Sequence, residues 1–157
     1  MHLVQHHLSD RLTIGTQPDT DDLKRLRDEG FSSIVNLRSA DETGHPLIDP
    51  LAEEAAVREQ GMGYVNYPVS LSELDPAMVD AFGAAIEDLT APIFVHCRGG
   101  KRSGALALMH IAIESGWTGD EALRKGEEAG YSCDDPKLVS FMRSYIDARR
   151  AAPPSGG

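Results

Sequence analysis

Short strand-like segments alternate with helix-like segments along almost the whole chain. Four apolar stretches have the length and residue types of strands, and they lie at residues 12–14, 33–37, 64–69 and 92–96. Helical patterns separate and follow them, at residues 21–29, 49–60, 76–89, 103–114, 119–129 and 136–149. Alternation of this kind is typical of an α/β domain, so we predict a central, mainly parallel sheet flanked by helices.

Two helix starts and one helix carry clear local signals. Thr20 is the expected N-cap of the first helix, and Gly30 is its expected C′ residue. Asp75 followed by Pro76 predicts another helix start, with the aspartate as N-cap and the proline in the first position. The segment 103–114 is almost wholly apolar and is therefore expected to be a buried, central helix.

Length and charge limit the classes of function. A chain of 157 residues fits one domain, which we place at residues 1–150, followed by a disordered tail at 151–157. The net charge of −10 argues against a nucleic acid or an anionic membrane as partner. Two cysteines suit a reducing compartment, and neither a secretory signal nor a membrane-spanning apolar run is visible. We therefore expect a cytoplasmic protein.

Residues 94–108, "FVHCRGGKRSGALAL", place a cysteine between an apolar strand and an apolar helix. Cys97 follows the strand, where open α/β sheets gather ligands. Gly99 and Gly100 permit positive φ, so that consecutive N–H groups can form an anion-binding nest at the helix N-terminus. Arg102 offers a bidentate fork for an oxyanion, and Ser103 a hydroxyl for the sulfur. This favours a thiolate nucleophile at the mouth of an anion cradle, open to solvent, over a merely buried cysteine.

The same stretch resembles the HC-x5-R-[ST] signature of cysteine-dependent phosphatases, in the dual-specificity branch. The segments "TQPDTDDLKRLRDEGFSSIVNLRSADE", "YVNYPV" and "SGWTGDEALRKGEEAGY" extend the resemblance to residues 8–149. Within that branch the chain most resembles the phosphatase-like domain of beta-lactamase hydrolase-like proteins. The resemblance implies a dual-specificity phosphatase-like α/β fold.

For the active site, the resemblance implies Cys97 as nucleophile, Arg102 as phosphate clamp and Ser103 as the group that stabilises the departing thiolate. His96 would orient the loop from beneath. The implied reaction is hydrolysis of phosphate monoesters, of the phosphotyrosine or aryl type, through a cysteinyl-phosphate. The partner would be a phosphorylated protein or small molecule, without a metal or organic cofactor. Arg98 and Lys101 are either solvated or steer the anionic substrate. The substrate-binding residues implied are His96, Arg98, Gly99, Gly100, Lys101 and Arg102.

One departure from the phosphatase signature concerns the length of the loop. Arg102 arrives after four intervening residues, which gives C-x4-R rather than C-x5-R. Rhodanese-type sulfurtransferases use a loop of this length around a cysteine that carries a persulfide. The beta-lactamase hydrolase-like relatives share the short form. A sulfurtransferase therefore remains an alternative, and a non-catalytic anion-binding module is a third reading.

A second departure concerns the general acid. Dual-specificity phosphatases usually keep an aspartate shortly after a strand, in a Pro-Val-x-Asp setting, but here the sequence "PVSL" at 68–71 has no carboxylate. The candidates are Glu73, Asp75, and Asp41 or Glu42 in the polar loop 39–46. Asp75 already has a structural explanation as an N-cap. Because the usual general acid is missing, we expect aryl phosphates to be better substrates than alkyl phosphates.

The remaining histidines and the second cysteine receive no catalytic role. His6 and His7 are adjacent and lack metal-ligand spacing. His110 lies inside the apolar helix and is expected to be a hydrogen-bonded core histidine. Cys133 is a possible disulfide partner for Cys97, which only geometry can decide.

Overall fold

Within the residues that the computed structural model describes, 3–38 and 49–151, five strands form one sheet in the order β1-β2-β5-β3-β4. The strands are β1 (Gln5–His7), β2 (Leu12–Gly15), β3 (Ser33–Asn36), β4 (Gly63–Asn66) and β5 (Ile93–His96). The helices are α1 (Thr20–Asp28), α2 (Pro50–Glu59), α3 (Pro76–Glu87), α4 (Lys101–Ser115), α5 (Gly119–Glu128) and α6 (Pro136–Ala151), with a 3-10 turn η1 (Leu71–Glu73) before α3.

The sheet is mainly parallel, as predicted. The pairs β2–β5, β5–β3 and β3–β4 are parallel, and only β1 runs antiparallel to its neighbour β2. Strand β1 was not predicted, because its three polar residues carry no strand pattern. In the register, Gly15 and Asn36 both pair with His96, so β2, β3 and β5 end together at one edge. That edge carries the predicted cysteine loop.

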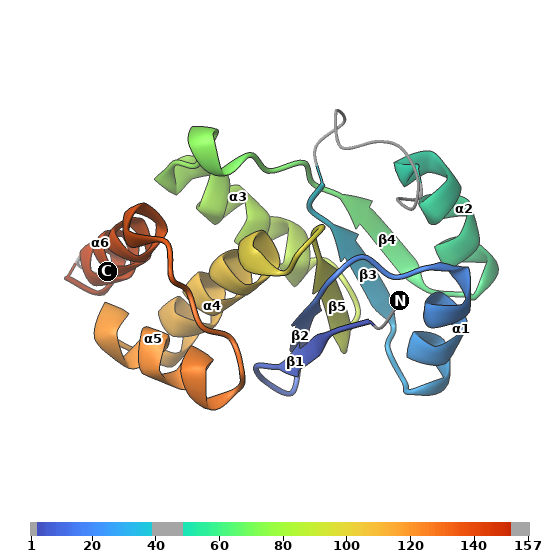
Figure 1. The fold of residues 1–157 in the computed structure, drawn as a ribbon, viewed down its shortest axis with the longest axis horizontal. Coiled ribbons are helices and arrows are strands. Elements are labelled where there is room, and N and C mark those ends of the chain that lie inside the picture. The colour runs from blue at the N-terminus through green and yellow to red at the C-terminus, as the bar shows by residue number, and fades with distance from the viewer. Residues whose placement is uncertain (1–2, 39–48, 152–157) are drawn as a thin grey trace.

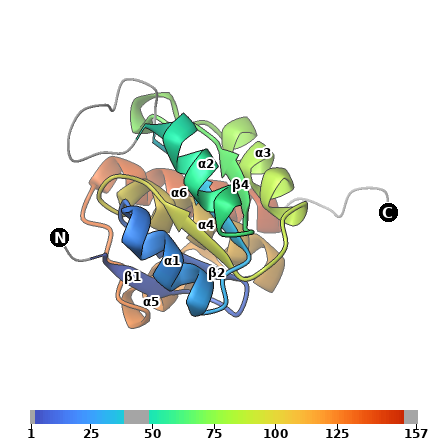
Figure 2. The same cartoon turned by 90° about the vertical axis from the view of Figure 1, so that its right-hand side faces the viewer.

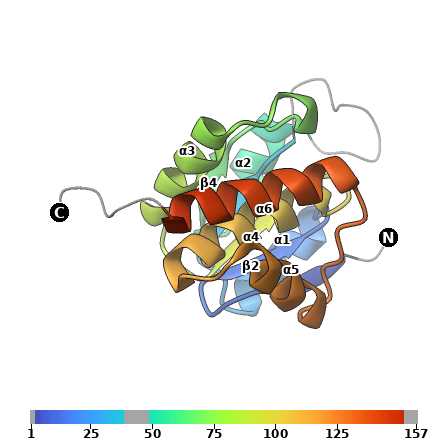
Figure 3. The ribbon, with the colours of Figure 1, turned by 90° about the vertical axis from the view of Figure 1, so that its left-hand side faces the viewer.

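Helices cover both faces of the sheet (Figure 1). Helices α1 and α2 lie on one face, toward the viewer in Figure 2, over a small core that includes Leu23, Val57 and Phe94. Helices α3, α4, α5 and α6 lie on the other face, seen in Figure 3, over a larger core that includes Val95 and Leu106. Helix α4 lies in the middle of this layer and has nine buried residues, which confirms the prediction of a central buried helix.

Several element boundaries differ from the predicted ones. The N-cap of α1 is Asp19 rather than Thr20, because the Asp19 carboxylate accepts the N–H of Asp22 in a capping box. Gly30 follows α1 with a φ of 104°, as expected of a C′ glycine. Strand β4 is shorter than predicted, and α4 begins at Lys101, two residues before the predicted start.

Some predictions fall at the limits of the described residues. Ala151 belongs to α6 rather than to the predicted tail. The rest of that tail, residues 152–157, lies outside the described residues, as does the predicted loop 39–46 with Asp41 and Glu42. In the ranges 3–38 and 49–151, no helix combines the length and the apolar character needed to cross a membrane.

Candidate active site

The predicted loop lies at the C-terminal edge of the sheet, between the middle strand β5 and helix α4. Cys97 directly follows β5, and Gly100 is the N-cap of α4 with a φ of 95°. Because an L side chain strongly disfavours this left-handed conformation, glycine is needed at position 100. Gly99 does not adopt a positive φ, although glycine permits it. One glycine, rather than two, makes the turn into the helix.

The Cys97 sulfur faces the N-terminus of α4. It accepts the N–H of Gly100 at 3.1 Å and the N–H of Ser103 at 3.5 Å. No side chain at Gly100 caps this helix, so the sulfur occupies the place of an N-cap oxygen. Two N–H donors and the positive end of the helix dipole therefore point at the sulfur, an arrangement that suits an anion at this place.

The position of Cys97 differs from the prediction in one respect. Its side chain was expected to be open to solvent at the mouth of the loop, but only 1% of the residue is exposed, and it packs with the larger core. The sulfur is shielded while it is held by the loop amides. Any reaction at this sulfur therefore requires that the side chain first become accessible to the substrate.

Ser103 lies beside the sulfur and is fully buried. Its Oγ lies 3.6 Å from the Cys97 sulfur, 3.1 Å from the carbonyl oxygen of Gly15 and 3.2 Å from that of Gly100. The hydroxyl has one proton to donate. A neutral thiol can donate to Oγ while the hydroxyl donates to a carbonyl. An ionised sulfur can instead receive the hydroxyl proton, which is the role predicted for Ser103.

Arg102 lies in the first turn of α4 and is half-buried. Its Nη1 donates to the carbonyl oxygen of Val69 at 3.0 Å and lies 3.5 Å from that of Leu37. These bonds hold the guanidinium between the loop and the segments that follow β3 and β4. Arg102 was predicted as a site residue, but these backbone partners were not.

The other two cations of the loop differ from each other. Arg98 and Lys101 are both exposed. The Nζ of Lys101 lies 3.8 Å from a carboxylate oxygen of Asp135. The backbone carbonyl of Lys101 accepts the hydroxyl of Tyr131 at 3.0 Å. Lys101 thus links the loop to the segment between α5 and α6, while Arg98 remains exposed to solvent.

His96 is held by a buried ionic cluster beneath the loop. Its Nε2 lies 2.6 Å from Oε2 of Glu53, which comes from α2, and both side chains are fully buried. Glu53 Oε1 accepts the amide of Gln17 at 2.6 Å and lies 3.7 Å from Nη2 of the buried Arg38. Burial by itself raises the pKa of Glu53, but the attraction and hydrogen bond of His96, helped by Gln17 and Arg38, hold that pKa below its usual value of 4.5.

Three residues that support the loop were not predicted, namely Glu53, Arg38 and Tyr131. Arg38 had a visible signal, because a charged residue directly follows the apolar strand in the segment "IVNLR". Glu53 is one of two adjacent glutamates in α2, and nothing local distinguishes it from Glu54. Tyr131 packs where Gly104 leaves room: a Cβ at Gly104 would lie 2.1 Å from the tyrosine ring.

The two described candidates for the general acid lie before α3. Asp75 is the N-cap of that helix, and its carboxylate accepts the N–H of Met78 at 2.8 Å. Glu73 ends the turn η1 and is exposed. Among the described residues, neither carboxylate has a hydrogen bond or ion pair with the loop residues 97–103. The structure thus gives Asp75 its predicted capping role and leaves Glu73 as a solvated carboxylate.

Substitution of Asp75 separates capping from proton donation. We expect Asp75→Asn to keep both stability and any hydrolytic activity, because asparagine caps a helix as well as aspartate does. Asp75→Ala should cost about 1 kcal/mol of folding free energy through the lost cap. Thermal unfolding and phosphate-release rates of the two variants check this. Loss of activity in Asp75→Asn without loss of stability would instead identify Asp75 as the acid.

Comparison with protein families gives one match over most of the chain. Residues 5–114 match the model described as "Beta-lactamase hydrolase-like protein, phosphatase-like domain". A beta-lactamase hydrolase-like protein from Xylella fastidiosa (strain Temecula1) is 33% identical over 137 residues, which are 87% of this chain and 31% of the relative. The chain spans about a third of the length of the curated relatives that it matches first.

Solved structures with the same fold include two protein–ligand complexes. P. aeruginosa TpbA in complex with pTyr has a TM-score of 0.73 at 18% identity, covering 93% of this chain and 87% of that one. PTPMT1 in complex with PI(5)P has a TM-score of 0.75 at 15% identity, covering 94% and 97%. At these identities the likeness establishes the fold, which is that of dual-specificity-like phosphatases, as predicted.

Proposed function

Since the chain belongs to the family of the phosphatase-like domain of beta-lactamase hydrolase-like proteins, we propose that it hydrolyses phosphate monoesters with Cys97 as the nucleophile. The observation that carries this proposal is the sulfur of Cys97 at the N-terminus of α4, where it accepts the N–H groups of Gly100 and Ser103. The same donors that favour a thiolate suit the oxygens of a bound phosphate.

In the first proposed step, the Cys97 thiolate attacks phosphorus and the bond to the leaving oxygen breaks. The loop amides and the Arg102 guanidinium stabilise the equatorial oxygens. The bonds from Nη1 to the carbonyls of Val69 and Leu37 hold this guanidinium beside the loop. The leaving oxygen takes a proton from water or from an acid, for which Glu73 is the candidate among the described residues.

In the second proposed step, water attacks the cysteinyl-phosphate and the sulfur–phosphorus bond breaks. The electron pair returns to sulfur, and the products are inorganic phosphate and the thiolate. Ser103 supports this step, because its Oγ lies 3.6 Å from the sulfur and can turn its proton toward it. The attacking water loses its proton as phosphate forms.

The substrate class follows from the weak provision for a general acid. A phenolate leaves with less help from protonation than an alkoxide does. We therefore propose a phosphotyrosine or other aryl phosphate, in a protein or a small molecule of the cytoplasm, rather than a nucleic acid or membrane component. The fold neighbour TpbA, solved with pTyr, is consistent with this class, while PTPMT1 was solved with PI(5)P.

A sulfurtransferase is the second candidate, and the loop length favours it. The loop from Cys97 to Arg102 has six residues, one fewer than the phosphatase signature requires. In that reaction the Cys97 thiolate attacks the outer sulfur of thiosulfate, sulfite leaves, and cyanide then removes the sulfur from the persulfide as thiocyanate. This cycle uses the same thiolate and the same loop amides.

One experiment distinguishes the two reactions. The protein is incubated with an aryl phosphate, or with thiosulfate and cyanide, and both product formation and intact mass after acid quenching are recorded. We expect phosphate release and a phosphorylated Cys97, without thiocyanate. Cys133→Ser, which removes the other free thiol, is the matched control and should behave as the original chain.

Other outcomes overturn the proposal. Thiocyanate formation with sulfur on Cys97 would establish the sulfurtransferase. If neither reaction occurs but phosphate still protects Cys97 from alkylation, the site is a non-catalytic anion-binding module. The alkylation also tests access to the buried sulfur, because reaction at Cys97 that phosphate suppresses shows that small molecules enter the loop.

A further inference from the structure

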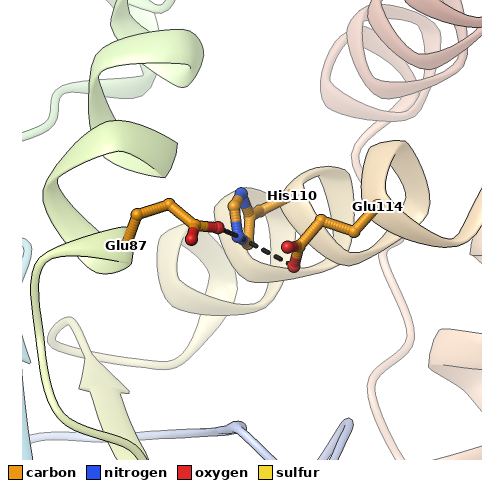
Figure 4. Close-up of side chains that lie close together, drawn as sticks. All are labelled: Glu87, His110 and Glu114. Carbon is orange, nitrogen blue, oxygen red and sulfur yellow. Dashed lines mark ion pairs between the residues drawn. The ribbon is translucent and has the colours of Figure 1, made fainter.

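Three potential metal ligands meet between α3 and α4, away from the cysteine loop (Figure 4). Glu87 comes from the last turn of α3, while His110 and Glu114 stand one turn apart on α4. His110 Nε2 lies 3.0 Å from Oε1 of Glu114 and 3.4 Å from Oε1 of Glu87. The three ligand atoms all lie within 4.8 Å of one another.

These separations suit a small divalent cation. Zinc bonds to histidine nitrogen and carboxylate oxygen are about 2.0–2.2 Å long, so two ligands at a tetrahedral angle lie about 3.3 Å apart. The two nitrogen–oxygen distances at His110 bracket that value. Glu87 and Glu114 both end in flexible, about half-exposed carboxylates, which can turn toward one ion at His110.

The packing holds the imidazole in place. The side chain of His110 is only 13% exposed, whereas Glu87 and Glu114 reach the surface from either side. Gly83 of α3 makes room for the ring, because a Cβ at that position would lie 2.9 Å from Nδ1 of His110. The ring is thus seated against α3 with Nε2 directed at the two carboxylates, and solvent can supply a fourth ligand.

The two carboxylates of the cluster carry negative charge that a bound cation would balance. Two carboxylates approach one imidazole nitrogen, and among the described residues no lysine or arginine pairs with Glu87 or Glu114. A neutral imidazole has one N–H at Nε2 at most, which cannot satisfy both carboxylates at full strength. A divalent ion would compensate both negative charges and accept the nitrogen lone pair.

We propose that Glu87, His110 and Glu114 form a binding site for a divalent first-row transition metal of the zinc type. One imidazole and two carboxylates suit zinc or cobalt, whereas magnesium and calcium select oxygen ligands. The ion would clamp the end of α3 to the second half of α4. His110 lies nine residues beyond Lys101, or about 13 Å along the helix, so this site is distinct from the cysteine loop.

The test is metal binding by the intact chain, measured by titration calorimetry with zinc and by the absorption spectrum of bound cobalt. We expect one saturable ion per chain at this site, without the charge-transfer band of a cobalt–thiolate bond. Zinc at 100 times its Kd should raise the Tm by about 5 °C or more. Magnesium and calcium at the same concentration should not compete.

Matched variants locate the ion. His110→Gln and Glu114→Gln should each weaken binding more than about 10-fold, since loss of an outer partner alone costs that much. Glu114 is 48% exposed, so its variant tests the site without endangering the fold.

Two control variants lie outside the site. Asp88→Asn removes the exposed acid next to Glu87, and His7→Gln removes a histidine of β1; both should bind zinc as the original chain does. Absence of saturable binding, a thiolate spectrum alone, or equal binding by all variants would each overturn the proposal.

Discussion

Cys97→Ser is expected to reduce aryl phosphate hydrolysis on the order of 10⁴- to 10⁶-fold, because a serine hydroxyl ionises far less readily than a thiol and is the weaker nucleophile. The serine oxygen can still accept the N–H groups of Gly100 and Ser103, so the loop keeps its local hydrogen bonds. We therefore expect a change in stability of no more than about 1 kcal/mol. Values of kcat/KM and Tm for the same preparation measure both effects.

The result depends on comparison with the other thiol. Cys133 is half-buried and free, and its sulfur contacts the carbonyl of Asp135 rather than the loop amides. Cys133→Ser should retain the full rate. If Cys97→Ser kept more than a small fraction of the rate while remaining folded, another group would be the nucleophile and the proposed reaction would be wrong.

Glu53→Gln is expected to cost about 3–5 kcal/mol of folding free energy, which for a chain of this size lowers the Tm by about 6–20 °C. The substitution keeps the shape of the side chain but removes the negative charge that His96 and Arg38 face inside the protein. It also weakens the support beneath the cysteine loop. A lower catalytic rate should accompany the loss of stability at temperatures where the variant is folded.

The neighbouring residue provides the control. Glu54 is partly exposed and forms a surface ion pair with Arg58 at 3.0 Å, so Glu54→Gln should change stability by less than about 0.5 kcal/mol. Equal losses of folding free energy in the two variants would mean that the buried charge of Glu53 contributes no more to stability than the surface charge of Glu54.

The stability difference should also depend on pH, with a definite sign. The folded structure lowers the pKa of Glu53 below its usual 4.5, so its charge stabilises the fold fully above that pH. As pH falls from 4.5 through the lower folded value, the contribution is lost. The Tm gap between the original chain and Glu53→Gln should therefore be full near neutral pH and shrink in acid. A gap that widened below pH 4.5 would contradict the assigned direction.

Most of the fold was predictable because its signals are local. The alternation of short apolar strands with capped helices predicted the layered architecture, and Asp75-Pro76 predicted the start of α3. The strand β1 was missed for the opposite reason: its residues Gln5–His7 form a strand only because β2 offers an unpaired edge. Edge pairing of a polar segment leaves no pattern in the segment itself.

The support beneath the candidate site was not predictable from α2 alone. An apolar residue is expected to face the core, yet Leu51 is 75% exposed while Glu53 is fully buried. The partner that makes this burial tolerable, His96, lies 43 positions later in the chain. Only the meeting of α2 with the ends of β3 and β5 explains which of two adjacent glutamates is inside.

The loop itself was predictable as a set of residues but not as an arrangement. Cys97, Arg102 and Ser103 come together because the turn is short. Among the described residues, by contrast, Arg102 bonds to the carbonyls of Val69 and Leu37, and a residue with any other side chain would offer the same carbonyl. Backbone acceptors carry no residue-specific signal, so the resting position of the guanidinium had to come from the structure.

The sulfur in the capping position of α4 has a further consequence for the proposed reaction. Before a substrate binds, the sulfur accepts the N–H groups of Gly100 and Ser103. An arriving phosphate competes for those same donors, and each one it takes leaves the sulfur less solvated and more reactive. Binding of the substrate and activation of the sulfur would then occur together. The thiolate would be most nucleophilic only when a phosphate occupies the loop.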